Sequence, residues 1–295
     1  MVGIEVLFLS MYPYFFVLVA AILWGMTGTT QTFLDDSISP LAVAAVRSAI
    51  GGGLLLVAAI ALGKIRVRSW SWKWTFMAAA SIALFQVLFF SSIRLTGVAI
   101  GTVVTIGSAP VFSGLLEWLV WKVRPTKVWG TATALAIVGC ILLFVNNDEA
   151  SVHIGGIILA LCAGVSFAFY TNVSKKLMMR EKALPAVAMT FSLCALLLLP
   201  FSVSEGYSWL AQSHNLLPML FMGIMCTSIA YVLFLSGLQK ISSSSAVTLS
   251  LAEPLTAAML GVFFVGEYLS VTSWSGVAML LGGILVLTLG SKNAK

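Results

Sequence analysis

Charged residues are scarce in this chain. Only 9% of its 295 residues are Asp, Glu, Lys or Arg, whereas 60% are hydrophobic and the mean hydropathy is +1.06. A soluble domain carries about 25% charged residues, so this chain has too few polar side chains to cover a surface that faces water. The net charge of +6 would suggest nucleic-acid binding in a soluble protein. Here we expect a lipid bilayer as the surroundings and no nucleic-acid partner.

Cysteine and histidine are also few. Cys140, Cys162, Cys194 and Cys226 all fall within apolar runs, with no CxxC pair and no Cys/His metal spacing. The sequence contains no glycine-rich phosphate loop, and no Ser/His/Asp or Cys/His set lies within its apolar runs. We therefore predict small buried thiols without a disulfide framework, no metal or other cofactor, and no enzymatic activity.

The N-terminal segment lacks positive charge. Glu5 is present, but no Lys or Arg precedes the first apolar run, and a cleavable signal peptide has a positively charged n-region. We interpret this run as a first membrane span.

Long apolar runs are what the chain has in abundance. Each is about 20 residues long, which is enough to cross about 30 Å of hydrocarbon. They cover residues 12–33, 40–62, 74–93, 99–120, 128–145, 154–174, 185–203, 216–237, 246–265 and 271–289. The connectors are short and include no soluble domain. The sequence thus predicts an all-α integral membrane protein with ten transmembrane helices in one compact membrane domain.

The basic residues lie almost entirely on one side of these runs. Fourteen of the sixteen Lys and Arg residues fall in the even-numbered connectors or the C-terminal tail, whereas the odd-numbered connectors contain Arg94 alone. The odd-numbered connectors carry Asp35, Asp36, Asp148, Glu149, Glu205 and Glu267. Solvation of single loops would not explain this split. The positive-inside rule predicts a multi-pass protein of the cytoplasmic (inner) membrane with both termini in the cytoplasm.

The chain also repeats itself weakly. Three features recur at offsets of 145, 145 and 144 positions: the Val-Leu-Phe-x-Ser segments at 87–91 and 232–236, Trp129 and Trp274, and Pro110 and Pro254. We predict two five-helix halves, residues 1–147 and 148–295. Because five is odd, the second half must enter the membrane from the opposite side. Such a 5+5 inverted repeat is common among secondary transporters.

Three short motifs carry a family resemblance: Leu23-Trp24-Gly25, Glu253-Pro254 and Gly266-Glu267-Tyr268-Leu269-Ser270. With the ten runs, they make the whole chain resemble the drug/metabolite transporter superfamily, in its EamA-type branch. The resemblance implies transport, and members similar to this chain export amino acids, other metabolites and drugs. The two halves are not identical, since Ala109 stands where the second half has Glu253, and Lys122 stands opposite Glu267.

Glu253 and Arg47 are charged residues inside apolar runs. Glu253 lies about 10 Å deep and could carry a proton or bind substrate. Alternatively, its carboxylate accepts hydrogen bonds near the Pro254 break or pairs with Arg47. Arg47 could bind a substrate carboxylate in fork geometry, but we favour a structural role for it, either an ion pair between helices or snorkelling. For Glu117, at the end of its run, we expect a snorkelling pair with Lys122.

Pro110 and Pro254 both fall near mid-membrane. If each breaks its helix, free backbone carbonyls would line a central cavity and the two breaks would share a gating role. Each proline could also produce a simple kink without any site, and the two interpretations are compatible.

Aromatic and amide residues gather on the runs that we expect around this cavity. Such side chains hold amphipathic solutes by stacking and hydrogen bonding, although phenylalanines more often pack or face lipid. With Glu253, the candidate substrate-binding residues are Trp24, Gln86, Phe89, Phe167, Tyr170, Asn172 and Tyr231.

Small residues near the C-terminus have structural interpretations. Gly276, Gly282, Gly283 and Gly290 would allow close helix approach, within the molecule or in a dimer. We interpret residues 242–245, all serine, as a helix cap and connector.

Together these features predict a secondary transporter that exports a small organic solute, such as an amino acid or related metabolite, by alternating access. We expect a small-molecule substrate as its partner and a monomer or homodimer. An intramembrane enzyme or a passive channel remains the alternative.

Overall fold

In the computed structural model, the structure describes residues 2–35, 37–65, 67–144, 153–203, 206–266 and 268–290, and every regular element in these ranges is helical. Several charged residues of the orientation argument lie outside the described residues: Asp36, Arg66, Asp148, Glu149, Glu205, Glu267, Lys292 and Lys295. Within the described part, nine helical segments are long and apolar enough to cross a membrane. The chain is a multi-pass membrane protein.

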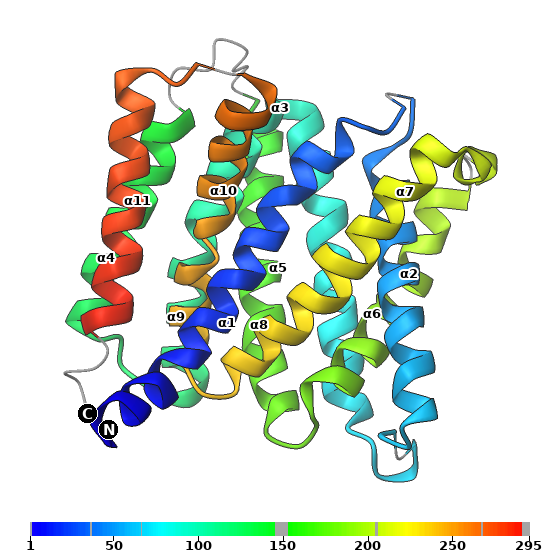
Figure 1. The fold of residues 1–295 in the computed structure, drawn as a ribbon, viewed down its shortest axis with the longest axis horizontal. Helices are drawn as coiled ribbons and strands as arrows, with labels where there is room; N and C mark the ends of the chain where they lie inside the picture. Colours follow the sequence, from blue (N-terminus) through cyan, green and yellow to red (C-terminus); the bar gives the residue numbers. More distant parts are fainter. Residues whose placement is uncertain are drawn as a thin grey trace.

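Helices account for each of the predicted apolar runs. Their bounds are α1 (Val2–Gln31), α2 (Pro40–Ala61), α3 (Trp72–Trp121), α4 (Lys127–Phe144), α5 (Ile154–Met178), α6 (Ala183–Ser202), α7 (Ser213–Phe221), the π-helical η4 (Met222–Ile229), α8 (Ala230–Leu238), α9 (Ser243–Leu249), α10 (Ala252–Leu260), the π-helical η5 (Gly261–Val265) and α11 (Val271–Gly290). Short 3₁₀ turns, η1 (Val67–Ser69) and η3 (Ser208–Ala211), lie in connectors. The start of α1 and the end of α11 lie at the same end of the molecule (Figure 1).

The third and fourth predicted runs together form one continuous helical element, α3, of 50 residues. Its backbone departs from helical geometry at Gly97, with φ 79° and ψ 163°, which a residue without a Cβ adopts at little cost. Beyond this point the chain folds back on itself. The evidence is the short distance between the two segments: a Cβ on Gly101 would lie 3.2 Å from the Cα of Ile93. A straight helix would place these two residues about 12 Å apart along its axis. The helix α3 is therefore a hairpin of two helical segments without a loop.

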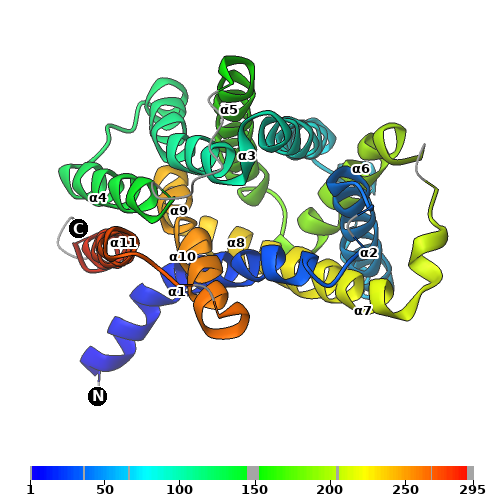
Figure 2. The same ribbon diagram turned by 90° about the horizontal axis from the view of Figure 1, so that it is seen from above.

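The helices α4 and α11 pack closely at one edge of the molecule (Figure 2). A Cβ on Gly139 would lie 2.7 Å from the carbonyl oxygen of Gly276, and one on Gly276 would lie 2.6 Å from that of Gly139. A Cβ on Gly283 would likewise lie 2.7 Å from the carbonyl oxygen of Ala132. Gly282, in contrast, would place a Cβ in open space. The predicted close approach is thus an internal contact for Gly276 and Gly283, and not for Gly282.

Two predictions about side chains near helix ends and in apolar runs are wrong. Glu117 is buried and does not snorkel with Lys122, because its carboxylate accepts hydrogen bonds from Ser243 and Ser244 at the start of α9. Cys162 is exposed, since it faces outward from α5, while the other three free thiols are buried as predicted. Ser242 does cap α9, accepting from the backbone N–H of Ser245 at 3.1 Å.

Candidate functional site

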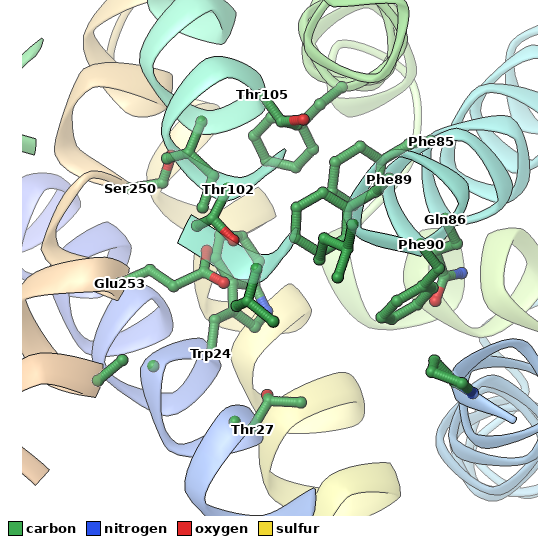
Figure 3. Close-up of a pocket in the computed structure, with 18 of the residues that line it drawn as sticks. Trp24, Thr27, Phe85, Gln86, Phe89, Phe90, Thr102, Thr105, Ser250 and Glu253 are labelled. Carbon is green, nitrogen blue, oxygen red and sulfur yellow. The ribbon is translucent and has the colours of Figure 1, made fainter. Parts of the chain in front are cut away.

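A cavity of about 380 Å³ lies among α1, α2, α3, α5, α8 and α10 (Figure 3). Its lining includes Gln31, the last residue of α1, and Pro40, the first residue of α2. The cavity therefore reaches the end of the helical bundle where α1 finishes and α2 begins. A volume of this size suits a small organic molecule.

Glu253 extends into this cavity from the first turn of α10, toward the space between Thr102 and Trp24 (Figure 3). No hydrogen bond or ion pair engages its carboxylate within the described ranges. A helix N-terminus favours a negative charge, but it does not replace the hydration that a carboxylate loses in an apolar site. The carboxylate is free to bind a proton or a ligand.

The α-helical hydrogen-bond pattern is interrupted before Glu253, at Ser250 and Leu251 between α9 and α10, although both residues keep right-handed helical dihedral angles. Pro254 has no N–H to donate to the Ser250 carbonyl one turn earlier. That carbonyl is not left free, however, because it accepts from the Glu253 N–H at 2.9 Å. The helix thus tightens locally into i→i+3 bonding. The prediction of a free carbonyl at this proline is wrong.

Pro110 behaves differently from its counterpart. It lies inside α3, and Gly97 is the one residue of α3 with non-helical dihedral angles. The chain at Pro110 accommodates the proline without interruption, as a simple kink would. Pro110 and Pro254 do not line the cavity in the part of the molecule that is described, although their neighbours Ala109 and Glu253 do. The expected symmetry of two broken helices is absent from this structure.

Arg47 lines the cavity from α2, beside Gln86, which lies across from Glu253 in Figure 3. Its Nη2 donates to Gln86 Oε1 at 2.9 Å, and Gln86 Nε2 in turn donates to Cys194 Sγ at 3.3 Å. Among the described residues Arg47 forms no ion pair with Glu253, so that alternative for the two charges is wrong. The cavity therefore contains two opposite charges that do not neutralise each other directly.

Aromatic rings form much of the remaining wall. The Trp24 ring lies 4.7 Å from that of Tyr231 and 6.2 Å from that of Phe167. Phe85 stacks on Phe89 at 5.5 Å. The Trp24 side chain is only 6% exposed, and its Nε1 has no hydrogen-bond partner in the described part. A buried indole N–H usually has a hydrogen-bond partner, whereas this donor is unsatisfied in the observed conformation.

The structure brings six of the eight predicted binding residues to the cavity wall: Trp24, Gln86, Phe89, Phe167, Tyr231 and Glu253. Tyr170 is fully buried behind this wall, with its ring 6.1 Å from that of Phe167. Asn172 points elsewhere and donates from Nδ2 to Ser113 Oγ at 3.2 Å and to Ala168 O at 2.9 Å. Five residues after Phe167, it lies about 140° around the helix. The structure therefore does not bring Tyr170 and Asn172 to the cavity.

Several lining residues are not among the predicted ones. They are Thr27, Phe85, Phe90, Thr102, Thr105 and Ser250. The threonines at positions 102 and 105 lie on one face of an apolar run at i,i+3 spacing, which would have been a usable signal. Phe85 lies one turn before Phe89 and could have been found in the same way.

Comparisons with known proteins give a consistent result. The EamA-like transporter family model matches residues 11–145 and again residues 154–289. The transporter YwfM of Bacillus subtilis (strain 168) is 44% identical over 280 residues, which is 95% of each chain. The inner membrane transporter YicL of Salmonella typhimurium (strain LT2) is 25% identical over 287 residues, covering 94% of this chain and 95% of YicL.

A solved crystal structure shares the fold. It superposes with a TM-score of 0.84 at 18% identity and covers 96% of this chain and 98% of its own. The family and the names of the relatives point to transport and not to enzymatic catalysis. The chain belongs to the EamA-like transporter family.

Proposed function

We propose that this protein is a secondary transporter that exports a small organic solute by alternating access around the central cavity. The observation that carries the proposal is the Glu253 carboxylate, which has no partner among the described residues, in an aromatic cavity whose described lining reaches one end of the bundle. Glu253 and Arg47 both line the cavity and do not pair with each other among the described residues, which suits a solute with both an amine and a carboxylate, such as an amino acid or a related metabolite.

In this proposal the bound solute contacts the six predicted residues that line the cavity. The aromatic rings of Trp24, Phe89, Phe167 and Tyr231 would hold its apolar part by stacking. Gln86 would orient Arg47, to which it is already hydrogen-bonded. Tyr170 and Asn172 would support the wall from behind.

The ten-span, 5+5 inverted arrangement is part of the same proposal. The reversal of α3 at Gly97 supports counting that element as two spans. The two family matches, to residues 11–145 and 154–289, support two halves at 1–147 and 148–295. The distribution of basic residues supports cytoplasmic termini, and in that orientation the open end of the cavity would face the outer side of the cytoplasmic membrane.

Counterflow in proteoliposomes tests the function. Vesicles are loaded with single unlabelled amino acids or amines, diluted into the radiolabelled form, and compared with protein-free vesicles. A carrier accumulates label transiently, because internal solute accelerates the return of the binding site. Flux without this trans-stimulation would indicate a channel, and its absence for every solute that a whole-cell efflux screen identifies would overturn the proposal.

A further inference from the structure

The cavity is closed toward the end of the bundle where α5 finishes. Beyond Phe167 the next residues of α5 and α8 that pack together are fully buried, including Tyr170, Leu177, Phe234 and Leu238. No part of the cavity lining reaches the last two turns of α5 within the described ranges. The proposed function requires this end to open during each transport cycle.

At this closed end a buried carboxylate connects α3 to α9. Glu117, from the second segment of α3, is only 8% exposed. Its Oε1 accepts from the Ser243 N–H at 3.1 Å, and its Oε2 accepts from the Ser244 N–H at 3.1 Å and from Ser244 Oγ at 2.6 Å. Three hydrogen bonds to a carboxylate are individually strong and together fix the start of α9 against α3.

The connector between α8 and α9 is held from a second side as well. Lys175, near the end of α5, donates from Nζ to the carbonyl oxygens of Leu238 and Ile241 at 2.6 and 2.7 Å. The ammonium thus caps the end of α8. Lys175 of α5 thus binds one end of this short connector, and Glu117 of α3 binds the other end.

We propose that Glu117, together with Ser243 and Ser244, is a latch that holds this end of the transporter closed and sets the equilibrium between its two access states. This inference rests on the proposed function. The latch joins the two proposed halves, because Glu117 precedes residue 147 and its partners follow residue 148. Opening the closed end separates α3 from α9 and must break the three hydrogen bonds.

The repeat provides no second carboxylate at the position related to Glu117, and Asp35, which bonds to His214 and Asn215 at the opposite end, is exposed. At offsets of 144 and 145 positions Glu117 corresponds to Gly261 and Val262, neither of which can form such bonds. A latch at this end shifts the resting equilibrium toward the state in which the other end is open. The cavity observed here is open at that other end, as this argument requires.

Thiol labelling of the purified full-length protein tests the latch without any solute. The substitution Val173→Cys places a reporter in the closed region, where Val173 is 4% exposed, and Val98→Cys places one on the open side, where Val98 is 64% exposed. Labelling by N-ethylmaleimide is followed at each cysteine by mass spectrometry. The native Cys140, buried in α4 and away from the latch, reports general loosening in every sample.

In the Glu117→Gln background we expect labelling of the introduced cysteine at position 173 to rise about tenfold, since the variant loses charge-assisted hydrogen bonds that only the closed state makes. Labelling at position 98 should fall, and labelling of Cys140 should stay unchanged. Ser244→Ala, which removes one donor, should shift both reporters in the same directions by less. Lys122→Gln, at the same end but without a bond to Glu117, should change neither.

Unchanged labelling at position 173 in Glu117→Gln would overturn the latch, as would a rise at position 173 matched by a rise at position 98 while Cys140 stays unchanged. If Glu117→Gln is not obtained folded, Ser244→Ala carries the same test. Failure of counterflow with normal reporter shifts would refute the proposed function and leave the latch intact. The reverse pattern would refute only the latch.

Discussion

Glu253 is the residue on which transport is expected to depend most. An unpaired carboxylate in an apolar cavity is costly, and the cost is relieved by a proton or by a cationic group of the solute. The variant Glu253→Gln keeps the shape of the side chain but can do neither. We expect its transport to fall at least about tenfold and to lose its dependence on pH.

Proteoliposomes with an imposed pH gradient provide the measurement for Glu253→Gln. The matched control is Glu253→Asp, which keeps the charge and should retain part of the flux and its pH dependence. A folded Glu253→Gln protein whose flux follows pH as the unmodified protein does would rule out proton transfer at this position.

Asp35, which lies outside the membrane spans, predicts how the stability of the protein changes with pH. Hydrogen bonds from Asn215 Nδ2, at 2.7 Å, and from His214 lower the pKa of Asp35 below its ordinary value of 3.8. A lowered pKa in the folded state means that this contact stabilises the protein above pH 3.8 and that its contribution is lost as the pH falls through the lowered value. In Asn215→Leu the pKa of Asp35 should rise toward 3.8.

Titration of the protein labelled with ¹³C at its aspartate carboxyl groups would follow this change, with the resonance of Asp35 assigned by Asp35→Asn. His214→Gln should raise the pKa of Asp35 by less than Asn215→Leu does, because the bond from Asn215 is the larger cause of the shift. An Asp35 pKa that does not move in Asn215→Leu would contradict the argument.

The sequence was sufficient for some residues of the site and not for others, for physical reasons. Trp24, Glu253 and Gln86 could be selected because polar or amphipathic groups deep in apolar runs need a cavity or a partner. Tyr170 and Asn172 could not be separated from them, since helix phase relative to the cavity is set by packing. The partners of Glu117 lie 126 and 127 positions away in sequence, so only the fold reveals them.

Among the elements, the packing of α4 on α11 depends on two glycines. Replacing Gly276 with alanine would bring a methyl group to 2.6 Å from the carbonyl oxygen of Gly139, so the helices must separate. We expect Gly276→Ala to destabilise the protein by about 1–3 kcal/mol, as overpacking typically does. Thermal unfolding in detergent, followed by tryptophan fluorescence, would measure the loss.

Gly282 on the same helix provides the control. A Cβ there meets no atom within 4 Å, so Gly282→Ala should leave stability unchanged or raise it by up to about 1 kcal/mol through better helix propensity. Equal unfolding temperatures for Gly276→Ala and Gly282→Ala would show that α4 and α11 are not in close contact.

Element boundaries followed well from apolar length, because hydrocarbon thickness dictates the length of a span. Three local features did not follow from it. The reversal at Gly97 replaces a connector with a single residue, and the π-helical segments η4 and η5 have no signal in composition. Pro110 and Pro254 have the same covalent constraint but different local backbones, since neighbouring contacts decide between a kink and a break.

For the whole molecule, the distribution of Lys and Arg predicts an orientation. Alkaline phosphatase fused after the C-terminus should be inactive and green fluorescent protein there should fluoresce, because both report a cytoplasmic location in a bacterial host. Phosphatase fused after Ser37, in the first connector, should be active. Phosphatase activity at the C-terminus would reverse the orientation and place the open end of the cavity toward the cytoplasm.

The contact between α4 and α11 shows how the two segments that match the family model are related in space. Its two tightest pairs are Gly139 with Gly276 and Ala132 with Gly283. Gly139 and Gly283 are 144 positions apart, as are Ala132 and Gly276, so exchanging the halves turns one pair into the other. Reciprocal contacts of this kind are those of a two-fold homodimer. The two segments that match the family model, residues 11–145 and 154–289, thus meet through equivalent faces, as two copies of one protein would across a two-fold axis.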